Sequence, residues 1–219
     1  STYYSSQKPE SFAKWAAATP EGFVFTLKAS RFCTNRKVLK DAGESVGKFL
    51  NQGVVELGDR LGPILWQFMA TKRFDADDFE GFLDLLPTTL AGLPLRHAVE
   101  VRHASFADPA FLAMCRARNV AVCLTEHAEF PMIADPVADF IYARLMAGSD
   151  EIETGYGPKA LDQWADRLQT YAAGDVPDDL PMLDQTPRTK DREVFAFFIS
   201  EGKVRAPAAA QALMARLKA

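Results

Sequence analysis

Charged side chains that could do chemistry stand out first in the segment from Leu95 to Phe106, which reads LRHAVEVRHASF. Its middle alternates small or apolar residues with charged ones, the period of a β-strand, so Glu100 and Arg102 point to the same side. Helical patterns precede and follow the segment, and a strand in that setting usually has both faces covered. Buried charges persist only when they are paired, hydrogen-bonded or liganded. Glu100 and Arg102 therefore form either a structural ion pair or part of a polar site, and we favour the site.

Polar residues also occur near the ends of the other expected strands. The positions that the same alternation turns inward are Thr26, Lys28, Gln67, Glu126, Tyr142 and Arg144. Lys28, Arg102 and Arg144, with Arg31 just beyond the first strand, would converge on Glu100, with Glu126 as a second candidate carboxylate. An excess of cations in a cleft suits a bound phosphate or carboxylate, because arginine holds such groups with two parallel hydrogen bonds.

This charged set is either a ligand site or a network of structural ion pairs, and both interpretations stay open. Within a ligand site, Glu100 is either a general base, and so a candidate catalytic residue, or a counter-ion that neutralises the cations around it. The candidate ligand-binding residues are Lys28, Arg31, Gln67, Arg102, Tyr142 and Arg144, and Arg102 is our first choice for the contact with an anion.

The elements that must position these residues alternate along the chain. Apolar runs predict strands at 23–30, 62–69, 95–103, 120–127, 140–146 and 194–199. Amphipathic patterns predict helices at 9–18, 43–58, 75–86, 108–118 and 158–172 and from Ala206 onward, and 173–193 is expected to be a surface loop. This alternation predicts an α/β fold with mostly parallel strands, closed into a TIM-like barrel, in a single domain over residues 1–219.

Several function classes receive no support. The sequence contains neither a glycine-rich phosphate loop nor a Gly-x-Ser-x-Gly elbow, and no metal centre is expected from His97, His103 and His127. We expect the three cysteines to be reduced thiols. A net charge of −4 does not favour nucleic acid as a partner. No apolar run approaches the about 20 residues of a membrane span, and no signal peptide is apparent, so we expect a cytoplasmic protein.

Five motifs in order resemble the YecE-like family, which carries number 72 among the domains of unknown function. They are FTLKASRFCTN (25–35), LGPILWQF (61–68), HAVEVRHASF (97–106), YARL (142–145) followed by Gly155-Tyr156, and KVRAPAAAQAL (203–213). The resemblance implies a TIM-barrel-like fold without an established activity, and its charged positions fall on Lys28, Arg31, Glu100, Arg102 and Arg144.

The chain departs from the family pattern in two places. The family has a first strand and helix upstream of the Ser-Thr-Tyr-Tyr segment in which this chain begins. The first strand is therefore expected to be missing here, either because the barrel lacks it or because this sequence does not include it. Asn35 stands where many members have histidine, which weakens any acid/base role for that position.

The sequence thus leads to three hypotheses. The first is an enzyme or binding protein that acts on a small molecule carrying a phosphate or carboxylate. The second is cleavage of nucleic-acid phosphodiesters, which rests on fold analogy and would need a basic groove and metal ligands. The third is a non-enzymatic protein in which the charged set is structural. The sequence identifies no cofactor and does not specify an oligomeric state.

Overall fold

The computed structural model describes residues 2–184, 190–199 and 203–218. Its strands are β1 (Phe25–Lys28), β2 (Leu61–Gln67), β3 (Thr89–Leu90), β4 (Leu93–Pro94), β5 (His97–Glu100), β6 (Ala121–Val122), β7 (Leu124–Glu126), β8 (Phe140–Leu145) and β9 (Glu193–Phe198). The α-helices are α1 (Pro9–Ala17), α2 (Arg31–Thr34), α3 (Gly43–Leu50), α4 (Ala76–Leu83), α5 (Pro109–Ala117), α6 (Pro158–Ala172) and α7 (Ala206–Leu217). Short 3-10 turns are η1 (Lys40–Ala42), η2 (Val54–Arg60) and η3 (Ala104–Phe106).

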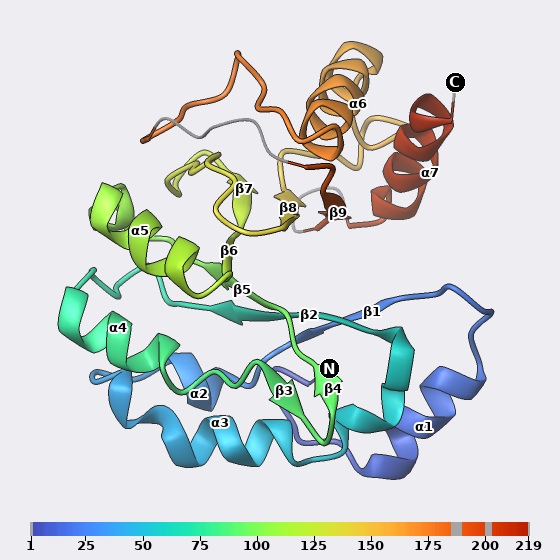
Figure 1. Cartoon of the computed structure of the whole chain (residues 1–219). Coiled ribbons are helices and arrows are strands. Elements are labelled where there is room, and N and C mark those ends of the chain that lie inside the picture. The colour runs from blue at the N-terminus through green and yellow to red at the C-terminus, as the bar shows by residue number, and fades with distance from the viewer. Residues whose placement is uncertain (1, 185–189, 200–202, 219) are drawn as a thin grey trace.

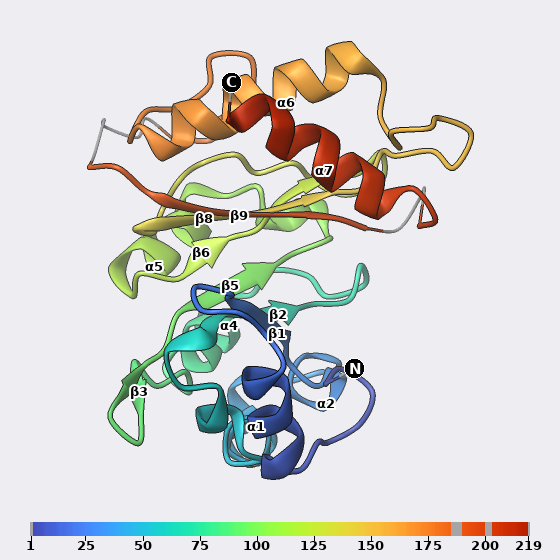
Figure 2. The ribbon, with the colours of Figure 1, turned by 90° about the vertical axis from the view of Figure 1, so that its right-hand side faces the viewer.

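Two parallel sheets form the framework of the protein. One has the strand order β1-β2-β5-β6 and the other β7-β8-β9, while β3 and β4 form a small antiparallel hairpin. Figure 1 shows α1 to α4 on the outer side of β1, β2 and β5, and α6 and α7 beyond β7 to β9 on the opposite side. The turned view in Figure 2 agrees, so the two sheets face each other and these helices lie on their outer sides. The predicted α/β class with mostly parallel strands is confirmed.

The described strands do not form the closed barrel that the sequence predicted. Among the described residues, β1 pairs only with β2, and β9 pairs only with β8. The strand expected at 120–127 is also interrupted at Cys123, which separates β6 from β7. The parallel strands therefore belong to two hydrogen-bonded sheets.

Three apolar clusters hold these layers together. The largest lies between the first sheet and its helices and is rich in aromatic rings, including Phe68, Phe79, Phe106 and Phe111. A second fills the space between β7–β9 and the helices α6 and α7. The third lies between the two sheets and contains small residues such as Ala98 and Ala121 beside larger rings. Small side chains there allow the two inner faces to approach each other.

The helix predicted at 43–58 is shorter than expected. It ends at Leu50, and the chain passes through Gly53 into the 3-10 turn η2. Gly53 has φ +114°, and a Cβ atom there would lie 2.5 Å from the Cα atom of Pro9. This position requires glycine both for its backbone conformation and for the close approach of α1.

Candidate functional site

The cluster of charged residues lies where the parallel strands end. Lys28, Gln67 and Glu100 are the last residues of β1, β2 and β5, and Arg144 is the penultimate residue of β8. Gln67 pairs directly with Glu100 in the register of β2 and β5, so their side chains share a face. Arg102 follows β5 by two residues and keeps the orientation of Glu100. We refer to Lys28, Gln67, Glu100, Arg102 and Arg144 as the cation cluster.

Three cationic side chains converge on a single amide oxygen. Gln67 Oε1 accepts hydrogen bonds from Lys28 Nζ at 2.7 Å, Arg102 Nη2 at 3.0 Å and Arg144 Nη1 at 3.1 Å. A carbonyl oxygen has two lone pairs, so this acceptor has more donors than it can satisfy well. Gln67 is buried, and the donors come from β1, from β8 and from the segment after β5.

Glu100 supplies the negative charge of the cluster. Its side chain is fully buried and binds both arginines: Arg102 Nε donates to Oε1 at 2.7 Å, and Arg144 Nη1 donates to Oε2. The cluster has three cations and one carboxylate, so its formal charge is +2 (3 − 1). The arginine side chains keep 22% and 12% of their surface exposed, so solvent reaches the cations while Glu100 stays covered.

Lys28 is perturbed by this environment. Burial lowers the pKa of its ammonium from the ordinary 10.5 to about 8, and nearby Arg144 and Arg102 act in the same direction while Glu100 opposes them. Its Nζ lies 4.0 Å from the centre of the Tyr3 ring, a cation–π contact. Lys28 therefore gives up its proton far more readily than a surface lysine.

Tyr142 and Arg31, two other predicted ligand-binding residues, lie outside this hydrogen-bonded group. Tyr142 is buried one alternation before Arg144 on β8, and its hydroxyl lies 3.4 Å from Thr26 Oγ1. Burial raises the pKa of Tyr142, so it stays protonated. Arg31 is exposed at the start of α2 and lies over the rings of Tyr4 and Phe32. None of these contacts joins Arg31 to the cation cluster, and its role in ligand binding stays a prediction.

The expectation that Glu126 faces the cluster is wrong. Its carboxylate accepts hydrogen bonds from the Tyr156 hydroxyl at 2.6 Å and from Trp164 Nε1 at 2.9 Å, on the side of α6. Thr125 is the residue of β7 that shares a register position with Arg144. The alternation of Ala121, Cys123 and Thr125 on the inner face is the sequence signal that would have placed Glu126 outside.

Phe130 is a neighbour of the cluster that sequence reasoning missed. The centre of its ring lies 4.5 Å from the guanidinium carbon of Arg102, and the His127 ring stacks on it with the ring centres 4.0 Å apart. Both aromatic residues belong to the segment that follows β7. This segment therefore covers one face of Arg102 and fixes the plane of its guanidinium group.

The histidines and cysteines have structural surroundings. Trp66 Nε1 donates to His97 Nδ1 at 3.1 Å, His97 Nε2 lies 2.8 Å from the carbonyl oxygen of Pro87, and burial lowers the pKa of this imidazole. Cys33, Cys115 and Cys123 are free and buried, as expected. Over residues 2–184, 190–199 and 203–218, no three His, Cys, Asp or Glu side chains come together as a metal site. No helix in this part of the chain is long and apolar enough to cross a membrane.

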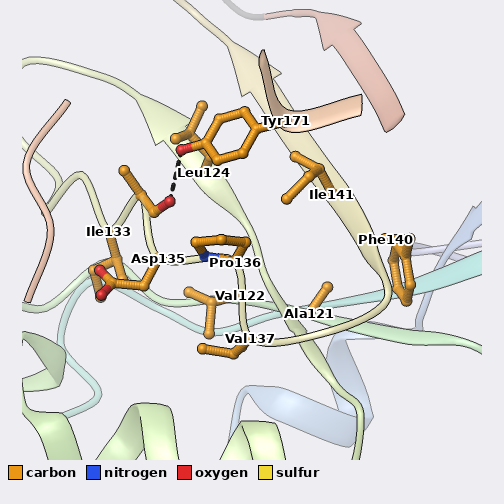
Figure 3. Close-up of a pocket in the computed structure, with 11 residues that line it drawn as sticks. Ala121, Val122, Leu124, Ile133, Asp135, Pro136, Val137, Phe140, Ile141 and Tyr171 are labelled. Atoms are coloured by element: carbon orange, nitrogen blue, oxygen red, sulfur yellow. Dashed lines mark hydrogen bonds between the residues drawn. The ribbon is translucent and has the colours of Figure 1, made fainter. Parts of the chain in front are cut away.

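A narrow cavity between β6, β7 and β8 and the segment 133–137 is shown in Figure 3. Its lining is mostly apolar, and its volume of about 10 Å³ is barely enough for one water molecule. The Tyr171 hydroxyl donates to the carbonyl oxygen of Ala134 at 2.6 Å, and Asp135 accepts hydrogen bonds from the backbone amides of Leu183 and Asp184. The polar groups of this cavity are thus already satisfied, and the cation cluster remains the candidate site.

The fold and the site define an α/β protein whose parallel strands end at an excess of positive charge. The family model described as protein of unknown function DUF72 matches residues 1–219, so the chain belongs to the DUF72 family, as its motifs indicated. No curated protein matches the chain.

Two solved structures of DUF72 family proteins are similar to this chain. One, from Enterococcus faecalis, has a TM-score of 0.74 at 16% identity, and the match covers 100% of this chain and 87% of that one. The other, from Thermotoga maritima, has a TM-score of 0.66 at 21% identity, with 99% and 80% covered. At these identities the likeness establishes the fold alone.

Proposed function

We propose that the cation cluster binds a small molecule through a phosphate or carboxylate group, as an enzyme or a binding protein. The observation that carries this proposal is the convergence of three cationic donors on the neutral oxygen of Gln67. A phosphate or carboxylate group offers several acceptor oxygens to the same donors and removes the excess positive charge.

The main competing interpretation is that the cluster only holds the sheets together. A purely structural network is expected to balance its charges, because each uncompensated buried charge is costly. Here one carboxylate faces three cations, and the protein keeps two of them partly exposed. Binding of an anion explains why this excess is retained.

We also infer that the two sheets are parts of the wall of a TIM-like barrel. Their parallel strands follow one another in chain order, their helices lie outside, and an apolar cluster fills the space between their inner faces. In such barrels the ligand site lies at the C-terminal ends of the strands. The cation cluster occupies that position. Nucleic acid is the weaker candidate, because a net charge of −4 gives no general attraction to phosphodiester backbones.

Isothermal titration calorimetry with inorganic phosphate, pyrophosphate and citrate tests the proposed function. We expect the parent protein to bind at least one of these anions. The nearly isosteric Gln67→Glu places a carboxylate among the three donors, so binding should weaken tenfold or more, about 1.4 kcal/mol. The control is Arg167→Met. Arg167 belongs to α6, where it pairs with Asp179 and takes no part in the cation cluster.

Two outcomes would contradict the proposal. One is that the parent protein binds none of the three anions. The other is that Gln67→Glu binds them as tightly as the parent protein and Arg167→Met do, since the anion would then not replace the acceptor at the centre of the cluster.

A further inference from the structure

Lys28 differs chemically from the two arginines with which it shares an acceptor. A guanidinium stays charged at every physiological pH, whereas a lysine that loses its proton becomes a nucleophile. Lys28 lies at the end of β1, and its Nζ is 2.7 Å from Gln67 Oε1, the atom that Arg102 and Arg144 also contact. An anion bound by the arginines would therefore place the rest of its molecule beside the Lys28 amine.

We propose, on the basis of the function proposed above, that Lys28 forms an imine with a small aldehyde or ketone whose phosphate or carboxylate group is held by Arg102 and Arg144. The lone pair of Nζ attacks the carbonyl carbon, a C–N bond forms, and the π electrons move to the carbonyl oxygen. Two protons pass from the nitrogen to that oxygen, which leaves as water while the C=N double bond forms. The step requires no oxidant or reductant.

The protonation state of Lys28 supports this chemistry. With a pKa of about 8, about a tenth of the Lys28 side chains are neutral at pH 7, against about 0.03% at the ordinary 10.5. This is roughly a 300-fold larger supply of nucleophile. Burial is the largest cause of the lowered pKa, and a ligand covering the site would add to the burial, while its negative charge would act in the opposite direction.

Neighbouring cations are a known way to activate a lysine, and the cluster provides two of them. Both guanidinium groups are fixed by the buried Glu100, so they stay in place whether or not a ligand is bound. The Tyr3 ring lies against the amine on another side. The amine is thus held in one place, which favours attack on a carbonyl group that the anion has oriented.

Pyridoxal 5′-phosphate and pyridoxal form a matched pair of probes, because they carry the same aldehyde with and without a phosphate. The full chain is treated with each probe and reduced with borohydride, and the modified lysines are identified by peptide mass spectrometry. We expect the preference for the phosphorylated probe over pyridoxal to be at least tenfold larger at Lys28 than at the exposed Lys159 of the same chain. Lys159 serves as the internal reference, because pyridoxal closes on its own hydroxyl group and therefore reacts more slowly with every lysine.

Lys28→Arg keeps the charge and removes the nucleophile. This variant should form no adduct at position 28, while modification of Lys159 by both probes should be unchanged. A parent protein that binds phosphate but is modified equally at Lys28 and Lys159 would overturn the imine and leave the proposed anion site intact. A parent protein that binds none of phosphate, pyrophosphate and citrate, and whose Lys28 prefers the phosphorylated probe no more than Lys159 does, would overturn both.

The pH dependence of reductive methylation provides a second measurement that needs no anion. The rate at Lys28 should reach half its maximum near pH 8. A rate at Lys28 that still rises steeply at pH 10 would overturn the activated amine.

Discussion

Replacement of Glu100 by glutamine distinguishes an anion site from a structural ion-pair network. Glu100→Gln keeps the volume of the side chain but leaves Arg102 and Arg144 without their carboxylate, and the formal charge of the cluster rises from +2 to +3. Removing one partner of a buried pair costs about 3–5 kcal/mol. In a chain of this length each 1 kcal/mol lowers the Tm by about 2–4 °C, so a fall of about 6–20 °C is expected.

Inorganic phosphate should then stabilise the variant more than the parent protein. A ligand at 100 times its Kd adds about 2.7 kcal/mol to the free energy of unfolding, and the more positive cluster should reach that condition at a lower phosphate concentration. Differential scanning calorimetry over a series of phosphate concentrations at constant ionic strength measures how far phosphate raises the Tm. The comparison is between the shift of Tm in Glu100→Gln and the shift in the parent protein.

Asp78→Asn is the matched control for a lost buried carboxylate. Asp78 accepts hydrogen bonds from the backbone amides of Leu39 and Lys40 and from Lys72 Nζ at 2.6 Å, outside the cation cluster. This variant should also be less stable, but phosphate should shift its Tm no more than it shifts that of the parent protein. If phosphate raised the Tm of the parent protein, Glu100→Gln and Asp78→Asn equally, the anion site would be refuted and the cluster would be a structural network.

Three further predictions follow from the site and the core. Arg102→Lys keeps the charge but loses the planar fork, so anion affinity measured by calorimetry should fall about 30-fold or more, and unchanged affinity would contradict contact through a guanidinium. Anion affinity should fall as pH rises through about 8, where Lys28 loses its charge, and Lys28→Arg should remove this dependence. Phe79→Ala opens a cavity among Phe106, Phe111 and their neighbours and should cost about 3–5 kcal/mol in chemical denaturation; a cost below 1 kcal/mol would contradict the packing described.

The lowered pKa of Lys28 also sets the direction of a stability change with pH. Between about 8 and 10.5 the unfolded chain binds a proton at this lysine that the folded chain does not. The contribution of Lys28 therefore makes the free energy of unfolding rise with pH across this window, and below it the protonated lysine destabilises the fold. The difference in unfolding free energy between the parent protein and Lys28→Met, followed over pH, isolates this contribution.

The sequence predicted the members of the cluster well because strand alternation is a local property. Glu100 and Arg102 could be placed on one face from their spacing alone, and Lys28, Gln67 and Arg144 from the same period in other strands. Arg31 could not be placed in this way, because Ser30 caps a helical turn directly after β1 and the strand alternation ends there. Ser30 as an N-cap was the local signal for that change.

Features that depend on contacts between distant segments were less predictable. The helix expected to reach residue 58 ends at Leu50, and the chain then passes through Gly53, against which Pro9 of α1 lies. Nothing near Gly53 in the sequence reveals that approach. Phe130 lies in a loop without periodicity, so no pattern indicated that it would cover Arg102. Whether the sheets close into a barrel likewise depends on pairing between the first and last strands, which local patterns do not report.

The charge balance of the strand ends is the strongest argument that the cluster is a site. Glu126, the other acidic residue considered for the inner face, binds Tyr156 and Trp164 on the side of α6. Glu100 is therefore left with three cations, and the position between them is taken by the neutral oxygen of Gln67. A carboxylate at position 67 would satisfy the same donors at almost the same volume, yet the chain has an amide there. An amide oxygen can be displaced by an incoming anion without leaving a buried negative charge behind, and this is what a binding site at these strand ends requires.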